Sequence, residues 1–287
     1  MSKKKRTEVF MIVALILVLL VVGIFFTRPN EVKYETIQET MRDGVLHNEN
    51  KMSFFGLEVN PSVISGYVVT CIILFFAAIL RIFVIPKFKL VPGRLQMLLE
   101  AWVGFFKGLA EENSPHRNGF LGAYLFTAGS YIFLGTTFEL FGFQWLTTSG
   151  HSLALPAPLA DINGAICMGV LSYGIIMSGG IAGNKFKGVA LTLKDFSLPI
   201  SMSFRLFGAL LSGLLVTELV YFYITLSFVL PVVIGVLFTL LHALIQAYVL
   251  TMLTSIFYGE VSEVHEKKPK EKKIKKKKAE PVQEAAN

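Results

Sequence analysis

Long apolar runs separated by short polar breaks dominate the chain. A bilayer core of about 30 Å is crossed by a helix of about 20 apolar residues, and about six runs are near that length or longer. They occupy residues 9–26, 62–85, 119–146, 162–183, 196–227 and 229–258. The last two are separated only near Pro231, which predicts a long C-terminal helical hairpin. The pattern therefore predicts an all-α polytopic membrane protein with about six transmembrane helices.

The segment 92–112 follows a different pattern. Its apolar residues recur at helical spacing, but Arg94, Glu100 and Lys107 stand among them. This mixture is typical of an amphipathic helix that lies in the membrane interface and does not cross the core. We therefore expect one interfacial helix in addition to the spans.

The first apolar run admits two interpretations. Residues 1–6 carry the basic stretch KKKR, and the run 9–26 could be a secretory signal or a retained membrane anchor. No small-x-small cleavage site follows it, which favours a retained span. Residues 1–26 are then an N-terminal anchor or signal-like span, and residues 27–60 an extracytoplasmic segment.

Basic residues predict the orientation of the chain. If the N-terminus is inside, KKKR, the segment from Arg81 to Arg94, the segment from Lys185 to Lys194 and the C-terminal lysines all fall on the same side. This arrangement satisfies the positive-inside rule at every crossing. Both termini are therefore predicted to be cytoplasmic, with residues 61–260 forming the main membrane domain.

The composition agrees with a membrane protein. Of the 287 residues, 53% are hydrophobic and only 16% are charged, which argues against a soluble globular protein. The formal net charge of +7 comes mostly from nine lysines between Lys267 and Lys278. Residues 261–287 are predicted to be a basic, disordered cytoplasmic tail, with binding to anionic lipid or an acidic partner as the alternative. We expect the lipid bilayer as a partner, and no nucleic acid, cofactor or metal.

Arg205 is a charged residue deep inside an apolar run. It lies about nine residues after Phe196, roughly 14 Å along a helix and near the centre of the core. An arginine there costs about 2.5–3.5 kcal/mol on insertion scales and usually faces a bundle interior or an aqueous cavity. The alternative is snorkelling to the interface. Three small residues, Gly208, Ala209 and Ser212, share its helix face and favour close approach of another helix.

A second set of polar residues points to a proton pathway. Thr239, His242 and Gln246 are spaced by three, four and seven residues, so one helix face carries all of them. Together with Arg205 and Glu218 they favour a pathway, although a lone histidine is more often hydrogen-bonded packing. Glu218 points about 220° away from Arg205 around the helix, so the two are not expected to form an ion pair.

Two further polar residues open a span. Asp161 and Asn163 begin the run after the breaker-rich stretch TTSGHSLALPAPLADIN. They could cap the N-terminus of that helix or stand at the mouth of a channel on the outer side. The sequence alone favours neither role.

Several of these stretches resemble the a subunit of F-type ATP synthases. PISMSFRLFGALLSG, around Arg205, resembles the family's Ser-x-x-Arg-Leu-Phe-Gly core. LIQAYVLTMLTSIFYGE resembles its last helix, LADIN the Asp-x-Asn opening of a middle helix, and VPGRLQMLLE its Pro-Gly-x-x-Gln-x-x-x-Glu segment. The resemblance covers roughly residues 60–260 and is most specific at Arg205.

The resemblance implies a function and its partners. The expected partners are a ring of c subunits, b-type peripheral stalk subunits and the remainder of the F1Fo ATP synthase. The basic N-terminus and the lysine tail suit a bacterial plasma membrane. Two proton half-channels would reach the ring, and Arg205 would face a carboxylate of the ring. The chain would have no catalytic activity alone, and the choice between proton and sodium would rest largely on the ring carboxylate.

The chain departs from the family pattern at three positions. Ala209 stands where the family commonly has Asn. Leu214 stands where it commonly has an acidic residue or His, and Thr239 where it commonly has Glu or His. Glu218 and His242 lie about one turn beyond the last two, which suggests a displaced titratable pair bridged by water. Asp195 and Ser201 are the candidates for the inner half-channel, chosen mainly by their location.

A secondary transporter is the alternative function. In that interpretation Arg205 would bind an anionic substrate. The chain has no evident internal repeat of the inverted kind found in many such transporters. The rotary interpretation is therefore favoured.

Overall fold

The computed structural model describes residues 52–54, 57–116, 118–146, 152–222 and 230–263. Within them the chain is mostly helical, as predicted for an all-α membrane protein. The first apolar run, 9–26, and the tail from residue 264 onward lie outside the described residues, as does the connection 223–229 of the predicted hairpin.

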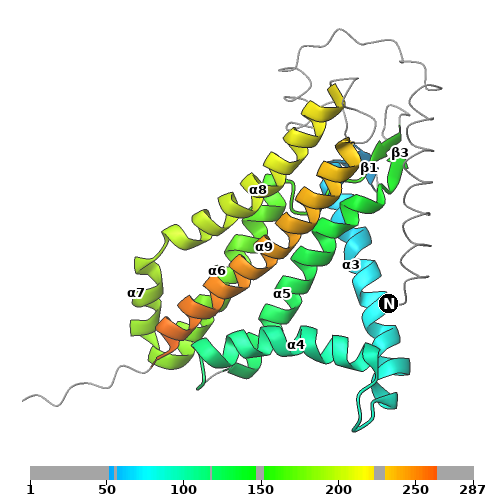
Figure 1. Cartoon of the computed structure of the whole chain (residues 1–287). Helices are drawn as coiled ribbons and strands as arrows, with labels where there is room; N and C mark the ends of the chain where they lie inside the picture. Colours follow the sequence, from blue (N-terminus) through cyan, green and yellow to red (C-terminus); the bar gives the residue numbers. More distant parts are fainter. Residues whose placement is uncertain (1–51, 55–56, 117, 147–151, 223–229, 264–287) are drawn as a thin grey trace, which may run out of the picture.

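The helix α3 spans Pro61–Ile79, close to the predicted start of the second run. Asn60 caps it by accepting a hydrogen bond from the Ser62 backbone N–H at 3.3 Å, and proline at the first helical position is favourable because its missing N–H would be unpaired anyway. A π-helical turn, Leu80–Val84, and a 3₁₀ turn, Ile85–Lys87, extend α3 into one continuous helical segment that ends at Lys87. Most of α3 stands apart from the bundle (Figure 1).

The helix α4, Arg94–Asn113, confirms the helical prediction for residues 92–112. It lies crosswise to the other long helices near one end of the molecule (Figure 1) and packs against α5 and α9. Its buried residues, Phe106, Leu109 and Ala110, lie in its second half. The first half leaves Leu95, Met97 and Leu98 exposed.

Four long helices form the bundle. They are α5 (Asn118–Phe138), α6 (Ile162–Asn184), α8 (Ser197–Phe222) and α9 (Leu230–Ser262). α6 packs against α8 and α9, while α5 packs mainly against α9 and α4. Apolar side chains fill the space between them, among them Leu125, Ile132, Ile176, Leu206 and Ala247.

A short helix that the sequence did not predict, α7 (Phe186–Lys194), joins α6 to α8. Lys185 makes the turn with a positive φ of 52°, which L-residues adopt rarely. α7 packs along α6 and meets α8 at a bend of 50°. The basic segment that was used to predict the orientation of the chain is therefore helical.

Two antiparallel β-hairpins were also not predicted. Strand β1 (Met52–Phe54) pairs with β2 (Leu57–Val59), and β3 (Gln144–Leu146) pairs with β4 (Ser152–Ala154). The apolar run expected over 119–146 is thus α-helical only to Phe138. A 3₁₀ turn, Glu139–Phe141, follows and is ended by Gly142 with φ 59°. The last residues of the run, Gln144–Leu146, are extended because they pair with β4.

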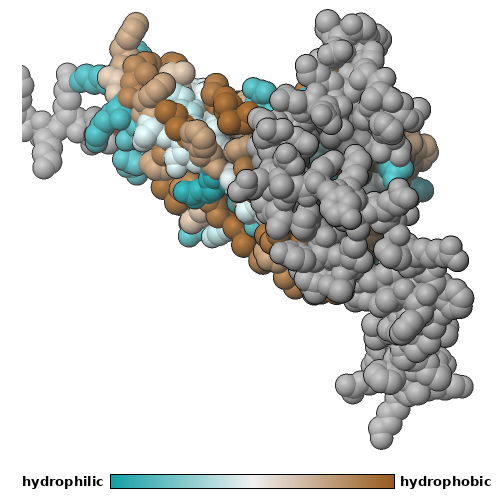
Figure 2. Space-filling model, turned by 90° about the horizontal axis from the view of Figure 1, so that it is seen from above, coloured by the Kyte–Doolittle hydropathy of each residue, from teal (hydrophilic) through white to brown (hydrophobic). Residues whose placement is uncertain are grey.

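Among the described residues, three helices are long and apolar enough to cross a membrane. They are Pro61–Lys87, Ile162–Asn184 and Gly235–Ser262, and the bent pair α7 and α8 makes a fourth if it counts as one span. Hydrophobic side chains cover much of the described surface in Figure 2. These features are those of a multi-pass membrane protein.

Candidate functional site

One face of α8 is buried against the bundle, and Arg205 lies on the opposite side of the helix. Met202, Ser203 and Leu206 on this face are buried. A Cβ added to Gly169 of α6 would collide with the side chain of Ser203, so the glycine permits the two helices to touch at that point. Arg205 follows Ser203 by two residues, about 200° around the helix, and it is exposed.

The small residues near Arg205 lie on an open surface. Gly208 and Ser212 are exposed and Ala209 is half-buried. A Cβ built on Gly208 would meet no atom within 4 Å, and the Ser212 hydroxyl donates to the Ala209 carbonyl at 2.8 Å. Within the described chain, this face of α8 is therefore free to receive another molecule.

Arg205 and Gln246 line the same crevice between α8 and α9. Gln246 is only 6% exposed, so it stands at the inner side of the crevice and Arg205 at the outer side. The crevice is too narrow to hold a water molecule. The two helices therefore leave no space for water between Arg205 and Gln246.

The other two members of the polar stripe on α9 line a different cavity. Thr239 and His242 face a space of about 20 Å³, which they share with Gly213 of α8 and Thr136 and Glu139 at the end of α5. A cavity of that size holds about one water molecule. The stripe is therefore divided between a narrow crevice at Gln246 and a small polar cavity at His242.

Glu139 is the functional candidate that the sequence interpretation missed. It lies within the apolar run 119–146, and a lone carboxyl in such a run is the same kind of signal as Arg205. It opens the 3₁₀ turn after α5, and the backbone N–H of Ala157 approaches its carboxyl group as a hydrogen-bond donor. The structure thus brings an acid and His242 to one cavity.

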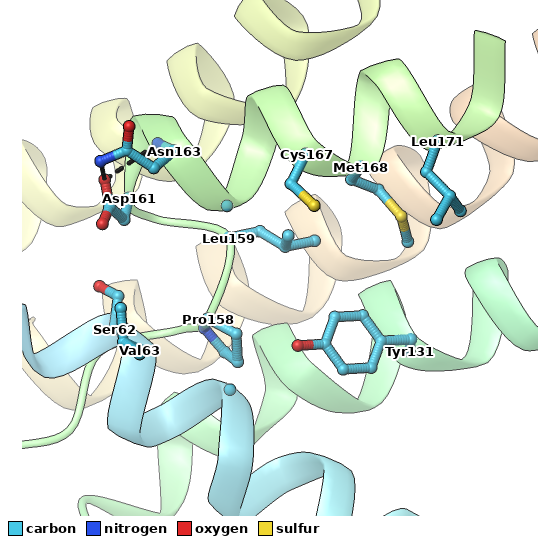
Figure 3. Close-up of a pocket in the computed structure, with 12 residues that line it drawn as sticks. Ser62, Val63, Tyr131, Pro158, Leu159, Asp161, Asn163, Cys167, Met168 and Leu171 are labelled. Carbon is cyan, nitrogen blue, oxygen red and sulfur yellow. Dashed lines mark hydrogen bonds between the residues drawn. The ribbon is translucent and has the colours of Figure 1, made fainter. Parts of the chain in front are cut away.

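Asp161 and Asn163 lie at the end of a larger cavity, of about 240 Å³, between α3, α5 and α6. Figure 3 shows these polar residues at one end and Met168 and Leu171 at the other, with the Tyr131 ring across from α6. Asp161 caps α6, because its carboxylate accepts from the Asn163 backbone N–H at 3.0 Å. The same residue therefore caps α6 and lies at one end of the cavity.

Asp161 also joins two helices. The Asn60 side-chain amide donates to its carboxylate at 3.0 Å, and Asn60 is itself the N-cap of α3. The N-termini of α3 and α6 are thus fastened to each other beside the cavity. Asp161 is 7% exposed, and hydrogen bonds of this kind compensate a buried carboxylate for lost hydration.

The α5 segment reaches both cavities. Tyr131 lines the larger one, and Thr136 and Glu139 line the small one. Ala157, which approaches Glu139, is followed directly by Pro158 in the wall of the larger cavity. The larger cavity, which is mostly apolar, and the small cavity are therefore close to each other along α5 and the turn that follows it.

The remaining candidates are not brought into this arrangement. Asp195 ends α7 and is partly exposed, and Ser201 is exposed on α8; neither lines the cavities described above. Glu218 belongs to α8, but its side chain and that of Leu214 lie outside the description. In the described part of the chain, no three His, Cys, Asp or Glu side chains are grouped so that they could hold a metal ion.

Comparison with known proteins gives a consistent result. The family described as ATP synthase A chain matches residues 63–259. ATP synthase subunit a of Cereibacter sphaeroides is 27% identical over 189 residues, which cover 61% of this chain and 72% of that protein. ATP synthase subunit a of Priestia megaterium is 27% identical over 242 residues, 76% of this chain and 99% of the relative. The matched region contains Arg205, Gln246, Glu139 and Asp161.

Proposed function

The chain belongs to the ATP synthase A chain family, and from that premise we propose that it provides two proton half-channels against a ring of c subunits. Proton flow through them turns the ring and drives ATP synthesis. As a family member the chain is a multi-pass subunit of the Fo sector that assembles with other ATP synthase subunits. The observation that carries the proposal is the exposed Arg205 on an open face of small residues.

Arg205 acts on the carboxylate of the ring. An opposite charge within about 4–6 Å lowers the pKa of a carboxyl group by about 1–3 units, so the proton leaves as the carboxyl group passes the arginine. Arginine keeps its charge at any relevant pH, whereas a desolvated lysine can lose it. The absence of room for water between Arg205 and Gln246 supports a second role, which is to separate the half-channels.

The outer half-channel begins at the cavity beside Asp161 and Asn163. From there the proton passes to Glu139, then through the small cavity to His242 and Thr239. The shared α5 wall and the one-water volume of the small cavity support this order. Glu218 lies beyond Gly213 on α8, in the direction away from Arg205, so it is a further candidate on the entry side of the small cavity, reached through water. Gln246 stands beside the arginine.

The inner half-channel and the topology rest on the sequence. Asp195 and Ser201 are the inner candidates because they lie near the beginning of α8. We propose about six spans including residues 9–26, α8 and α9 as the tilted hairpin, and both termini in the cytoplasm of a bacterium. The c ring would contact the hairpin, and b-type stalk subunits the rest of the membrane domain.

Cross-linking tests the proposed interface. Gly208→Cys places a thiol on the open face of α8, and the control Gly174→Cys places one on α6, where no described atom lies within 4 Å of the added Cβ. With cysteines along the c subunit near its carboxylate, Gly208→Cys should form disulfides with the c subunit and the control should not. Equal cross-linking of both, or none, would contradict the interface. Uptake of an anionic solute by the purified chain alone in liposomes would instead favour a secondary transporter.

A further inference from the structure

A groove of about 960 Å³ lies between α4 and α9, far larger than the cavities of the proposed proton path. Its walls are apolar or aromatic and include Trp102, Phe105, Phe133, Leu244 and Tyr248. Leu244 and Tyr248 are 53% and 45% exposed, so the described chain does not fill the groove. Arg94 is the one charged residue among those that line it.

The aromatic wall of the groove is held in place. The Trp102 indole N–H donates to the Ser130 hydroxyl at 2.9 Å, and its ring centroid lies 5.2 Å from that of Phe133. Phe105 and Tyr248 bring α4 and α9 together with ring centroids 6.2 Å apart. Because the indole N–H is already paired, Trp102 presents apolar surface to the groove. The groove is preformed for an apolar occupant.

The charged end of the groove is suited to an anion. Arg94 is the first residue of α4, whose N-terminus has no side-chain cap and no acidic residue in its first turn. The helix dipole and the guanidinium therefore act in the same direction. Gln96 exchanges hydrogen bonds with the backbone of Lys89 at 3.1 and 3.0 Å, which holds a second basic residue beside this end. Glu100 accepts from the Gln96 amide at 2.8 Å.

We propose that this groove binds an anionic phospholipid. Its acyl chain would lie between α4 and α9 against the aromatic wall, with its phosphate at Arg94. A molecule with a long apolar body and one anionic end matches an apolar groove that is charged at one end. The volume lies within the range of about 300–1,000 Å³ that ligand pockets occupy, and basic pockets between membrane helices commonly bind anionic head groups.

The lipid site is separate from the proposed proton path. Leu244 and Tyr248 are each two residues from Gln246, which places them roughly 160° from it around α9. The groove therefore opens on the side of α9 away from the Arg205 crevice. A bound lipid would join the crosswise helix to α9 without entering the path.

Photolabelling of the assembled complex tests the site. The purified complex, stripped of endogenous lipid, would be incubated with micelles that contain phosphatidylglycerol or phosphatidylcholine with a photoreactive group on the acyl chain. We expect the anionic probe to label peptides of α4 and α9 about fivefold more than the neutral one, since one basic side chain near the head group contributes about that factor. Arg94→Gln should abolish the preference, and Arg81→Gln, an exposed arginine outside the groove, should keep it.

A second variant fills the groove. Ala101 is exposed and lines it, so Ala101→Trp should lower labelling by both probes without crowding the buried core. Equal labelling by the two lipids in the unmodified chain, or a preference that survives Arg94→Gln, would overturn the proposal. The proposal would also be overturned if Ala101→Trp left the labelling unchanged. It would be overturned as well if neither α4 nor α9 were labelled, which is the result expected if a helix of another subunit occupies the groove.

Discussion

Glu139 and His242 line one small cavity, although one opens the turn after α5 and the other lies in the middle of α9. Thr239 stands beside them, and the cavity has room for about one water molecule. An acid and an imidazole around a single water are groups that can pass a proton between them. This juxtaposition changes the outer half-channel proposed from the sequence, because it supplies a carboxyl group in place of the missing acid at Leu214.

Replacement of Glu139 is the first prediction. Glu139→Gln keeps the shape of the side chain and removes its titration, so proton-driven ATP synthesis should fall by about a hundredfold or more, as for loss of a proton-transferring group. Glu111→Gln is the matched control, because Glu111 is exposed in an ion pair with Lys107 at 3.4 Å and such pairs contribute little. Synthesis at an equal rate in both variants would exclude Glu139 from the path.

His242 gives the second prediction. If His242 and Glu139 act in series, His242→Ala should lower proton-driven pumping, and the double variant should be little worse than the more damaging single variant. Independent roles would instead multiply the two losses. Pumping by His242→Ala at the original rate at every pH measured would remove His242 from the path.

The two roles of Asp161 can be separated. Asp161→Asn keeps a residue that caps helices as well as aspartate does but removes the charge and the oxygen that Asn60 contacts. Asn60→Ala removes the same contact and leaves the carboxylate in place. We expect proton-driven synthesis to fall in Asp161→Asn and to stay near normal in Asn60→Ala. Similar rates in the two variants would mean that Asp161 only caps and fastens the helices.

The stability of these variants should follow the same contacts. Asp161→Ala loses the N-cap, worth about 1 kcal/mol, together with a hydrogen bond to a charged group, worth about 1.5–3 kcal/mol. The thermal unfolding temperature should therefore be low for Asp161→Ala and also for Asn60→Ala, because Asn60→Ala loses the N-cap of α3 and the same hydrogen bond. Asp161→Asn, which keeps the cap of α6, should unfold at a higher temperature than either. An unfolding temperature for Asp161→Ala equal to that of the unmodified chain would contradict the hydrogen bonds described.

The approach of α6 to α8 gives a further prediction. In Gly169→Ala the new methyl group would meet the Ser203 side chain and the Pro199 carbonyl, so the unfolding free energy should fall by about 1–3 kcal/mol. Gly174→Ala, in the same helix with no atom within 4 Å of the added Cβ, should be neutral or stabilising by about 0.5–1 kcal/mol. Equal thermal stability of the two variants would show that the helices do not touch at Gly169.

Local signals explain what could be predicted from the sequence. The run predicted over 162–183 is α6, Ile162–Asn184, because a capping aspartate and a continuous apolar stretch determine both of its ends. The same holds for the start of α3, where Asn60 and Pro61 are adjacent. Local spacing also predicted that the small residues share a helix face with Arg205 and favour the approach of another helix; that Arg205 itself is exposed is known only from the structure.

Contacts between distant residues explain the rest. The strand β3 is extended because it pairs with β4, and the apolar content of residues 144–146 is equally compatible with helix. The helix α7 is stabilised by packing against α6, which a basic, short segment does not reveal by itself. The place of Glu139 beside His242 depends on the packing of α5 against α9, and no periodicity within either segment indicates it.

The central claim is that Arg205 couples proton flow to the synthesis of ATP. It is tested most directly by proton-driven ATP synthesis in membrane vesicles that carry Arg205→Ala, with Arg81→Gln as the control for loss of an exposed arginine elsewhere. We predict that synthesis falls to background in Arg205→Ala and is unchanged in the control, while ATP hydrolysis by the detached head stays normal in both. Synthesis at the normal rate in Arg205→Ala would contradict the account.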